Sequence, residues 1–225
     1  EVAGNWCGGV PTASTNVTIP GGTTVHITSA PGSPAVCNNL TINGTLIIDA
    51  GKALSVGGTL VNNGTTANLV INDNGSLIYT AGNNIAGTAY RTVTHGNNHL
   101  FSSAVQSTTF GDVFPSQQAN IWAYLWNPTT NAWVNQTYQS SMTPGLGYLV
   151  YANATAGTQT AEFIGQFNND GVQQAVSTAN GGWNLLGNPY TSAIDWDNGV
   201  WQTGLVNSVA IWTGSNYIYW NGSIG

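Results

Sequence analysis

Residues 39–79 read NLTINGTLIIDAGKALSVGGTLVNNGTTANLVINDNGSLIY, and this stretch decides the fold. Its short segments alternate apolar and polar side chains, which predicts brief strands with one buried face. Leucines recur every six to nine residues and glycines punctuate the gaps. Short strands at such spacing are typical of a solenoid in which each turn stacks on the last. The repeating positions are Leu40, Leu46, Leu54, Leu60, Leu69 and Leu77, with Gly44, Gly51, Gly57, Gly58, Gly64 and Gly75.

The same pattern begins near residue 16 and ends near residue 80. It predicts a parallel β-helix-like solenoid over residues 1–89, with a meandering sandwich as the alternative. A solenoid needs its open end covered, and the segment around Trp6 is the expected N-terminal cap. Asparagines fall at the expected corners, where this residue tolerates left-handed backbone. They are Asn38, Asn39, Asn62 and Asn63.

Residues 90–225 follow a different pattern, because aromatic residues crowd in and the leucine period disappears. A weak internal duplication pairs residues 96–105 with 181–190, and residues 123–133 with 209–219. The second pair predicts two hairpins, each a strand, a turn and a returning strand. We therefore expect an antiparallel β-sandwich, jelly-roll-like, after the solenoid, and an all-β chain throughout.

The duplication is incomplete at its C-terminal side. The first hairpin is followed by an expected strand over residues 144–151, whereas the second copy reaches Gly225 before an equivalent strand. A fragment of a longer protein, or copies that are not strictly equivalent, would explain this. The sharper hypothesis is an open sheet near Gly225 that a neighbouring subunit completes.

Charged residues make up 4% of the chain, against about 25% in ordinary globular domains. Lys52 and Arg91 are its only strong cations and the net charge is −6. Nucleic-acid binding needs clustered cations, so we do not expect it. No apolar run reaches the roughly 18 residues of a membrane helix, so we expect no membrane insertion. No signal peptide is visible, which indicates a mature or trimmed chain.

Cys7 and Cys37 lie outside any metal-binding spacing. In an extracellular chain a disulfide between them is the leading interpretation, with reduced thiols or an intermolecular bridge as alternatives. Such a bridge would staple the expected cap to the solenoid.

Catalytic chemistry has little support in this composition, and we predict no catalytic residues. Asp49 and Asp73 are the only carboxylates of the repeating stretch, residues 16–80, and both follow strands at turn positions where Asp is common. Asp195 and Asp197 resemble part of a calcium loop, although a structural turn is the favoured interpretation. No other cofactor is expected.

The aromatic residues of the second half outnumber those that one core needs. We expect an exposed subset to contact sugars or neighbouring subunits, since such surfaces are rich in Trp and Tyr. The candidates are Trp122, Trp126, Trp133, Trp201, Trp212 and Trp220.

Several stretches resemble modules of large secreted surface proteins of the Bacteroidota, exported by the type IX secretion system. The matching residues are 4–12, 16–20, 37–43, 144–150 and 182–196, the last reading GWNLLGNPYTSAIDW. The resemblance implies an extracellular or cell-surface protein of adhesin type. We therefore expect a non-catalytic structural or adhesive protein, either a surface adhesin or the subunit of a fibre. The alternative is a carbohydrate-binding or carbohydrate-processing β-helix module.

Overall fold

The computed structural model describes residues 6–29, 33–79, 85–116, 118–155, 157–169, 171–196, 209–213 and 216–220. The chain forms two compact units, Glu1–Ala193 and Ile194–Gly225. The regular elements of the described residues are nearly all β-strands, as the sequence pattern predicts. The short helical pieces are α1 (Phe110–Val113) and three 3-10 turns, Thr66–Asn68, Gln118–Asn120 and Ala179–Gly181.

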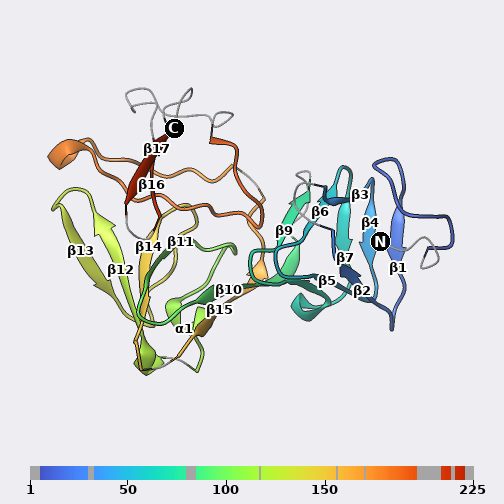
Figure 1. The fold of residues 1–225 in the computed structure, drawn as a ribbon, viewed down its shortest axis with the longest axis horizontal. Coiled ribbons are helices and arrows are strands. Elements are labelled where there is room, and N and C mark those ends of the chain that lie inside the picture. The colour runs from blue at the N-terminus through green and yellow to red at the C-terminus, as the bar shows by residue number, and fades with distance from the viewer. Residues whose placement is uncertain are drawn as a thin grey trace. The chain divides into compact units, whose positions relative to one another are not determined.

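The N-terminal part is a β-solenoid of three turns, which confirms the predicted parallel architecture (Figure 1). Each turn contributes one short strand to each of three sheets, and within each sheet these strands run parallel. The first sheet contains β1 (Val17–Ile19), β4 (Leu40–Ile42) and β7 (Leu60–Asn62). In the second, β2 (Thr24–Ile27), β5 (Thr45–Ile48) and β8 (Leu69–Ile71) are neighbours. The third holds β3 (Ala35–Cys37), β6 (Ala53–Val56) and β9 (Ser76–Tyr79).

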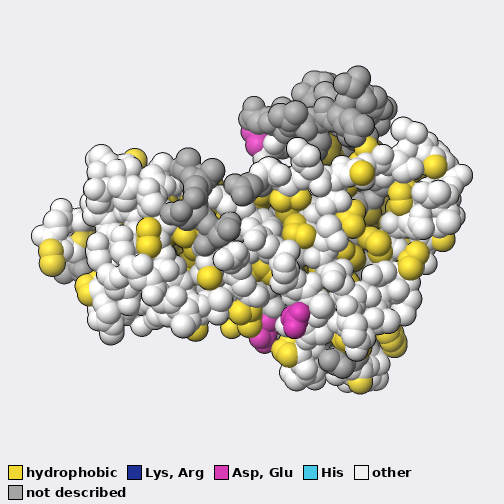
Figure 2. All heavy atoms as spheres, turned by 180° about the vertical axis from the view of Figure 1, so that it is seen from behind, with side chains coloured by type: hydrophobic (Ala, Val, Ile, Leu, Met, Phe, Trp, Pro, Cys, Tyr) yellow, Lys and Arg dark blue, Asp and Glu magenta, His cyan; other side chains and the backbone are white. Residues whose placement is uncertain are grey.

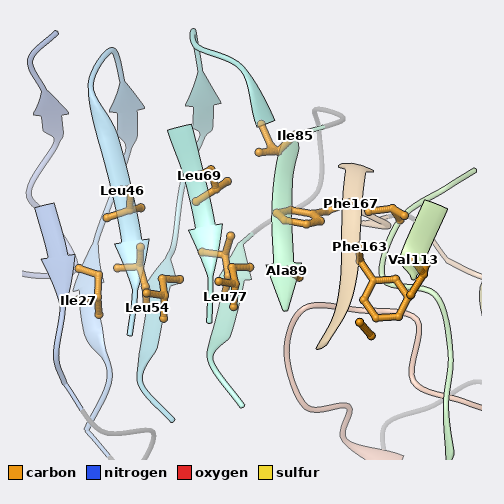
Figure 3. Close-up of a cluster of buried hydrophobic side chains, with 14 of the residues drawn as sticks. Ile27, Leu46, Leu54, Leu69, Leu77, Ile85, Ala89, Val113, Phe163 and Phe167 are labelled. Carbon is orange, nitrogen blue, oxygen red and sulfur yellow. The ribbon is translucent and has the colours of Figure 1, made fainter. Parts of the chain in front are cut away.

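The repeating leucines stack between successive turns. Leu40 pairs with Leu60, Leu46 with Leu69, and Leu54 with Leu77, one pair in each sheet. All six are at most 4% exposed, and Figure 3 shows several of them pointing into the space between the sheets. Side chains of one turn therefore rest on those of the next, and the stack forms a continuous apolar core.

Asparagine side chains bridge the turns of the solenoid at its corners. The Oδ1 atom of Asn16 accepts hydrogen bonds from the Nδ2 atoms of Asn38 and Asn39, both at 3.0 Å. One turn further on, Asn63 Nδ2 donates to Asn43 Oδ1 at 2.8 Å. The expectation of left-handed backbone at these corners is wrong. The described non-glycine residues with positive φ are Asn74, Asn131 and Asn180, and the four corner asparagines are not among them. Asparagine is used here for its side-chain amide rather than for its backbone freedom.

Strand β10 (Ala86–Val93) belongs to both parts of the first unit. It runs parallel to β8, with Thr88 opposite Val70, and antiparallel to β15 (Gln159–Gln166) along its whole length. The five-stranded sheet has the order β15-β10-β8-β5-β2. The division expected after residue 89 therefore falls inside a strand of a continuous sheet.

The antiparallel part adds a second sheet with the order β11-β14-β12-β13. Its strands are β11 (Asn98–Phe101), β12 (Ile121–Asn127), β13 (Ala132–Gln136) and β14 (Tyr148–Ala152). Phe101 of this sheet meets Phe163 of β15 edge to face, with ring centroids 5.9 Å apart. Since apolar side chains of the two sheets pack in this way, the predicted antiparallel sandwich is confirmed.

Residues 182–193 tie the two parts together. Gly147 N donates to Leu185 O and Gly187 N donates to Gly145 O, both at 3.0 Å, beside the start of β14. Further along, Leu77 N of β9 donates to Thr191 O, and Thr191 Oγ1 donates to Leu77 O, again at 3.0 Å. One segment thus bonds to both the sandwich and the last turn of the solenoid.

The second unit contains a hairpin of β16 (Val209–Trp212) and β17 (Tyr217–Trp220). Trp212 lies opposite Tyr217, as Trp126 lies opposite Trp133 in the β12–β13 hairpin. Both duplicated segments therefore form antiparallel hairpins with an aromatic pair near the turn, as expected. The open edge hypothesised near Gly225 involves residues outside the described ones.

The expected disulfide is not formed in the structure. Cys7 lies on an exposed turn, whereas Cys37 is buried. In β3 the inward positions are Ala35 and Cys37, so the alternation of the strand turns the Cys37 side chain into the solenoid core. Trp6 and Pro11 lie against the first turn and, with Val17 and Val25, line a small apolar cavity there.

Candidate binding surface

The outer face of the sheet β11-β14-β12-β13 carries a group of aromatic side chains that are not buried. Along β12, Ile121 and Ala123 are buried inward. Alternation then places Trp122, Tyr124 and Trp126 on the opposite side. We call this surface the aromatic face. It comprises Trp122, Tyr124, Trp126, Trp133, Asn135, Leu149, Tyr151, Asn98 and Leu100.

One end of the aromatic face is built by Trp122 and Tyr151. These residues are opposite each other on β12 and β14, and their rings are parallel within 3° with centroids 5.4 Å apart. Trp122 is nevertheless 46% exposed. The stacked neighbour restricts the rotamer of Trp122 while a large part of the indole stays accessible to a ligand.

The other end is built by Trp126 and Trp133. They are cross-strand partners with ring centroids 5.2 Å apart and an interplanar angle of 68°. Trp126 Nε1 donates a 2.9 Å hydrogen bond to the backbone oxygen of Trp183. Trp133 is 45% exposed, so an accessible indole lies beside an anchored one. Large aromatic side chains are mostly buried in folded proteins, so a group of exposed ones indicates a binding surface.

Polar groups lie between and beside the rings. Tyr124 is opposite both Asn135 of β13 and Leu149 of β14. At the margin, Asn98 of β11 is opposite Tyr151. Amide and phenol groups provide hydrogen-bond donors and acceptors without charge. The face therefore combines apolar rings with neutral polar groups.

Both cations of the chain lie away from the aromatic face. Lys52 follows β5 at a corner of the solenoid. Arg91 lies in β10 and donates to Tyr90 O at 2.8 Å. Burial lowers the pKa of Arg91. The nearby Asp73 carboxylate acts in the opposite direction but is the smaller effect. On the side shown in Figure 2, described side chains are mostly uncharged, with acidic groups in only a few places.

The other aromatic candidates belong to the C-terminal part of the chain. Trp212 and Trp220 are in the β16–β17 hairpin of the second unit, and Trp201 lies outside the described residues. Trp212 packs against Tyr217 with ring centroids 5.0 Å apart. Of the six candidates, the structure brings Trp122, Trp126 and Trp133 together on one surface. Sequence reasoning missed Tyr151 and Trp183, since no local pattern shows that they adjoin these tryptophans.

The acidic candidates have partners or fall outside the description. Asp49 Oδ1 is 2.8 Å from His26 Nδ1, and Asp73 Oδ1 accepts from Thr92 N at 3.0 Å. Asp195 is exposed, and Asp197 lies outside the described residues, so the calcium site stays a prediction. Within the described ranges, no group of three or more His, Cys, Asp or Glu side chains is placed to hold a metal ion.

A family model described as a domain of unknown function, DUF8693, matches residues 1–221. Neither the curated proteins nor the solved structures contain a match to the sequence. Among the described residues, no helix has the length and apolar character needed to cross a membrane.

Proposed function

The chain belongs to this DUF8693 family, and we propose that it is a non-catalytic, extracellular adhesive module that binds carbohydrate through its aromatic face. The observation that carries the proposal is the pair of exposed indoles, Trp122 and Trp133, on one side of a sheet, with the anchored Trp126 on the same side. Sugar rings have apolar faces that stack on aromatic rings, and hydroxyl rims that bond to amides and phenols. The aromatic face supplies both kinds of group.

Preorganisation supports binding by this surface. Stacking on Tyr151 restricts Trp122, and the bond to Trp183 O restricts Trp126. Side chains that are already ordered lose less entropy when a ligand arrives, so more of the contact energy is retained as affinity. The antiparallel sheet provides the rigid base that such a site requires.

A cell-surface location is part of the same proposal. The chain has very few charged residues, and its motifs resemble those of type IX-secreted surface proteins of the Bacteroidota. Low charge removes repulsion between closely packed neighbours, which suits a protein that works in a dense surface layer.

Replacing Trp122 with alanine tests the proposal. We expect about a tenfold loss of apparent affinity on a glycan array for the glycans that the wild-type chain binds, because one stacking ring is lost. The measurement is array binding followed by titration calorimetry with the best soluble glycan. Tyr219→Ala is the matched control, since Tyr219 is an exposed aromatic residue of the second unit and should leave binding unchanged. Equal losses in both variants, or no glycan binding by the wild type, would refute the proposal.

A fibre subunit is the second candidate, and the open sheet edges favour it. Strand β13 is the last strand of its sheet, and both Trp133 and Val134 are exposed on it. Its five residues, Ala132–Gln136, carry no charge and no proline to block a further strand. Gln136 Nε2 donates to Val134 O at 3.0 Å and so covers part of this edge.

Light scattering over a range of protein concentrations, paired with negative-stain electron microscopy, tests the second candidate. Association through β13 predicts oligomers or filaments in the wild type that disappear in Val134→Lys, because a charge on an edge strand opposes pairing with a further strand. Asn135→Lys, on the same strand and the outer face, should perturb the edge less. A strict monomer at high concentration would exclude the fibre subunit and leave carbohydrate adhesion.

A further inference from the structure

The aromatic face contains two separate aromatic clusters rather than one. Trp122 with Tyr151 forms the first, and Trp126 with Trp133 forms the second. Trp122 and Trp126 are four residues apart on β12, which corresponds to about 14 Å along an extended strand. A single sugar ring is too small to touch both clusters.

Tyr124 fills the interval between the clusters. It lies on the same side of β12 as the two tryptophans, with Asn135 and Leu149 opposite it. The row from Trp122 through Tyr124 to Trp126 therefore presents aromatic rings at every second residue. Such a row fits an extended chain molecule that runs along the strand.

The same surface lacks any means of neutralising a negative ligand. Recognition of carboxylate, sulfate or phosphate groups relies on Arg or Lys. Both cations of the chain, Lys52 and Arg91, lie outside the face, and Arg91 is already bonded to Tyr90 O. With a net charge of −6, the protein as a whole repels polyanions.

We propose that the aromatic face takes a neutral polysaccharide chain that lies along β12 and contacts both clusters at once. This inference rests on the proposed carbohydrate-binding function and adds to it the charge and the minimum length of the ligand. Two clusters joined by one chain act as linked subsites, so occupation of the first raises the effective concentration at the second. Affinity should therefore rise with chain length until both clusters are spanned, and then level off.

The charge of the ligand is tested by affinity electrophoresis of the full chain in gels that contain defined polysaccharides. The neutral probes are soluble starch, mixed-linkage β-glucan, xylan and galactomannan, and the anionic probes are polygalacturonate, alginate and hyaluronate. We expect retardation by at least one neutral probe and none by the anionic probes. Retardation by an anionic probe that Trp122→Ala abolishes would overturn the neutral ligand while leaving carbohydrate binding intact. Absence of retardation by every probe would overturn both proposals.

The length of the ligand is tested by calorimetry with oligosaccharides, from disaccharide to octasaccharide, of the neutral polymer that retards the chain most. We expect affinity to increase by about tenfold or more between the shortest ligands and those that span both clusters. Trp133→Ala removes an exposed ring of the second cluster and should abolish this increase of affinity with chain length. Circular dichroism verifies that the variant is folded. An affinity that does not depend on length in the wild type would overturn the two-cluster inference.

Discussion

Replacing Phe163 with alanine is expected to lower the free energy of unfolding by about 3–5 kcal/mol, the range typical of a phenylalanine removed from a packed core. Phe163 is 1% exposed in β15 and meets Phe101 edge to face. It stands where the five-stranded sheet packs on the antiparallel sheet, and Figure 3 shows its ring beside Val113 of α1. Truncation would leave a cavity between two sheets, and neither sheet can close it without breaking its own hydrogen bonds.

Urea denaturation of the wild type and the variant measures this loss. The neighbouring residue Ile164 is the matched control, because it is 48% exposed on the other side of the same strand. Ile164→Ala should change the free energy of unfolding by less than about 1 kcal/mol. The melting temperature of Phe163→Ala should fall by roughly 10 °C, given the size of the chain. Similar losses in the two variants would contradict the packing described for β15.

The substitution Gly44→Ala is expected to destabilise the solenoid by about 3 kcal/mol, at the upper end for overpacking. A Cβ atom at Gly44 would lie 2.3 Å from the backbone oxygens of both Pro20 and Thr23, which belong to the preceding turn. Gly44 N also donates to Ile19 O, so the residue is fixed against that turn. Since both clashing atoms are backbone, a side chain cannot move aside and the turns themselves must separate.

Gly57→Ala provides the control, at another corner of the solenoid, between β6 and β7. Its Cβ would approach Cys37 O no closer than 3.8 Å, an ordinary contact. We expect a change of about 0.5 kcal/mol or less, with a stabilising sign because alanine restricts the unfolded chain. Thermal unfolding of the two variants side by side distinguishes them. Equal stability of Gly44→Ala and Gly57→Ala would show that the turns are spaced more widely than described.

The architecture of the solenoid could be predicted because its signal is local. Each turn contains its own alternation of apolar and polar residues, and the glycines mark where strands end. The pairing of Leu46 with Leu69 could not be predicted, since lateral register depends on residues more than twenty positions apart. The position of strand β10 could not be predicted for a related reason. Its sequence AGTAYRTV lacks the recurring leucine, and only tertiary packing shows that it stacks on the last turn and also pairs with β15.

The binding surface, too, could be predicted only where the signal is local. Trp122 and Trp126 could be placed on one side of a strand, because alternate residues of a strand share a face. Their neighbours Tyr151 and Trp183 come from segments whose position depends on the whole sheet. The orientation of Cys37 also depends on register. Alternate residues of β3 point inward, so a shift of one residue would turn the Cys37 side chain outward.

Strand β10 also determines how mechanical force would travel through the first unit. Tension applied at the antiparallel sheets reaches β15 and then passes through β10 into β8, β5 and β2. Backbone hydrogen bonds of one sheet carry the load. The segment that bonds Thr191 to Leu77 offers a second, parallel path. Under shear the solenoid and the sandwich would therefore resist rupture together, as a single stiff element.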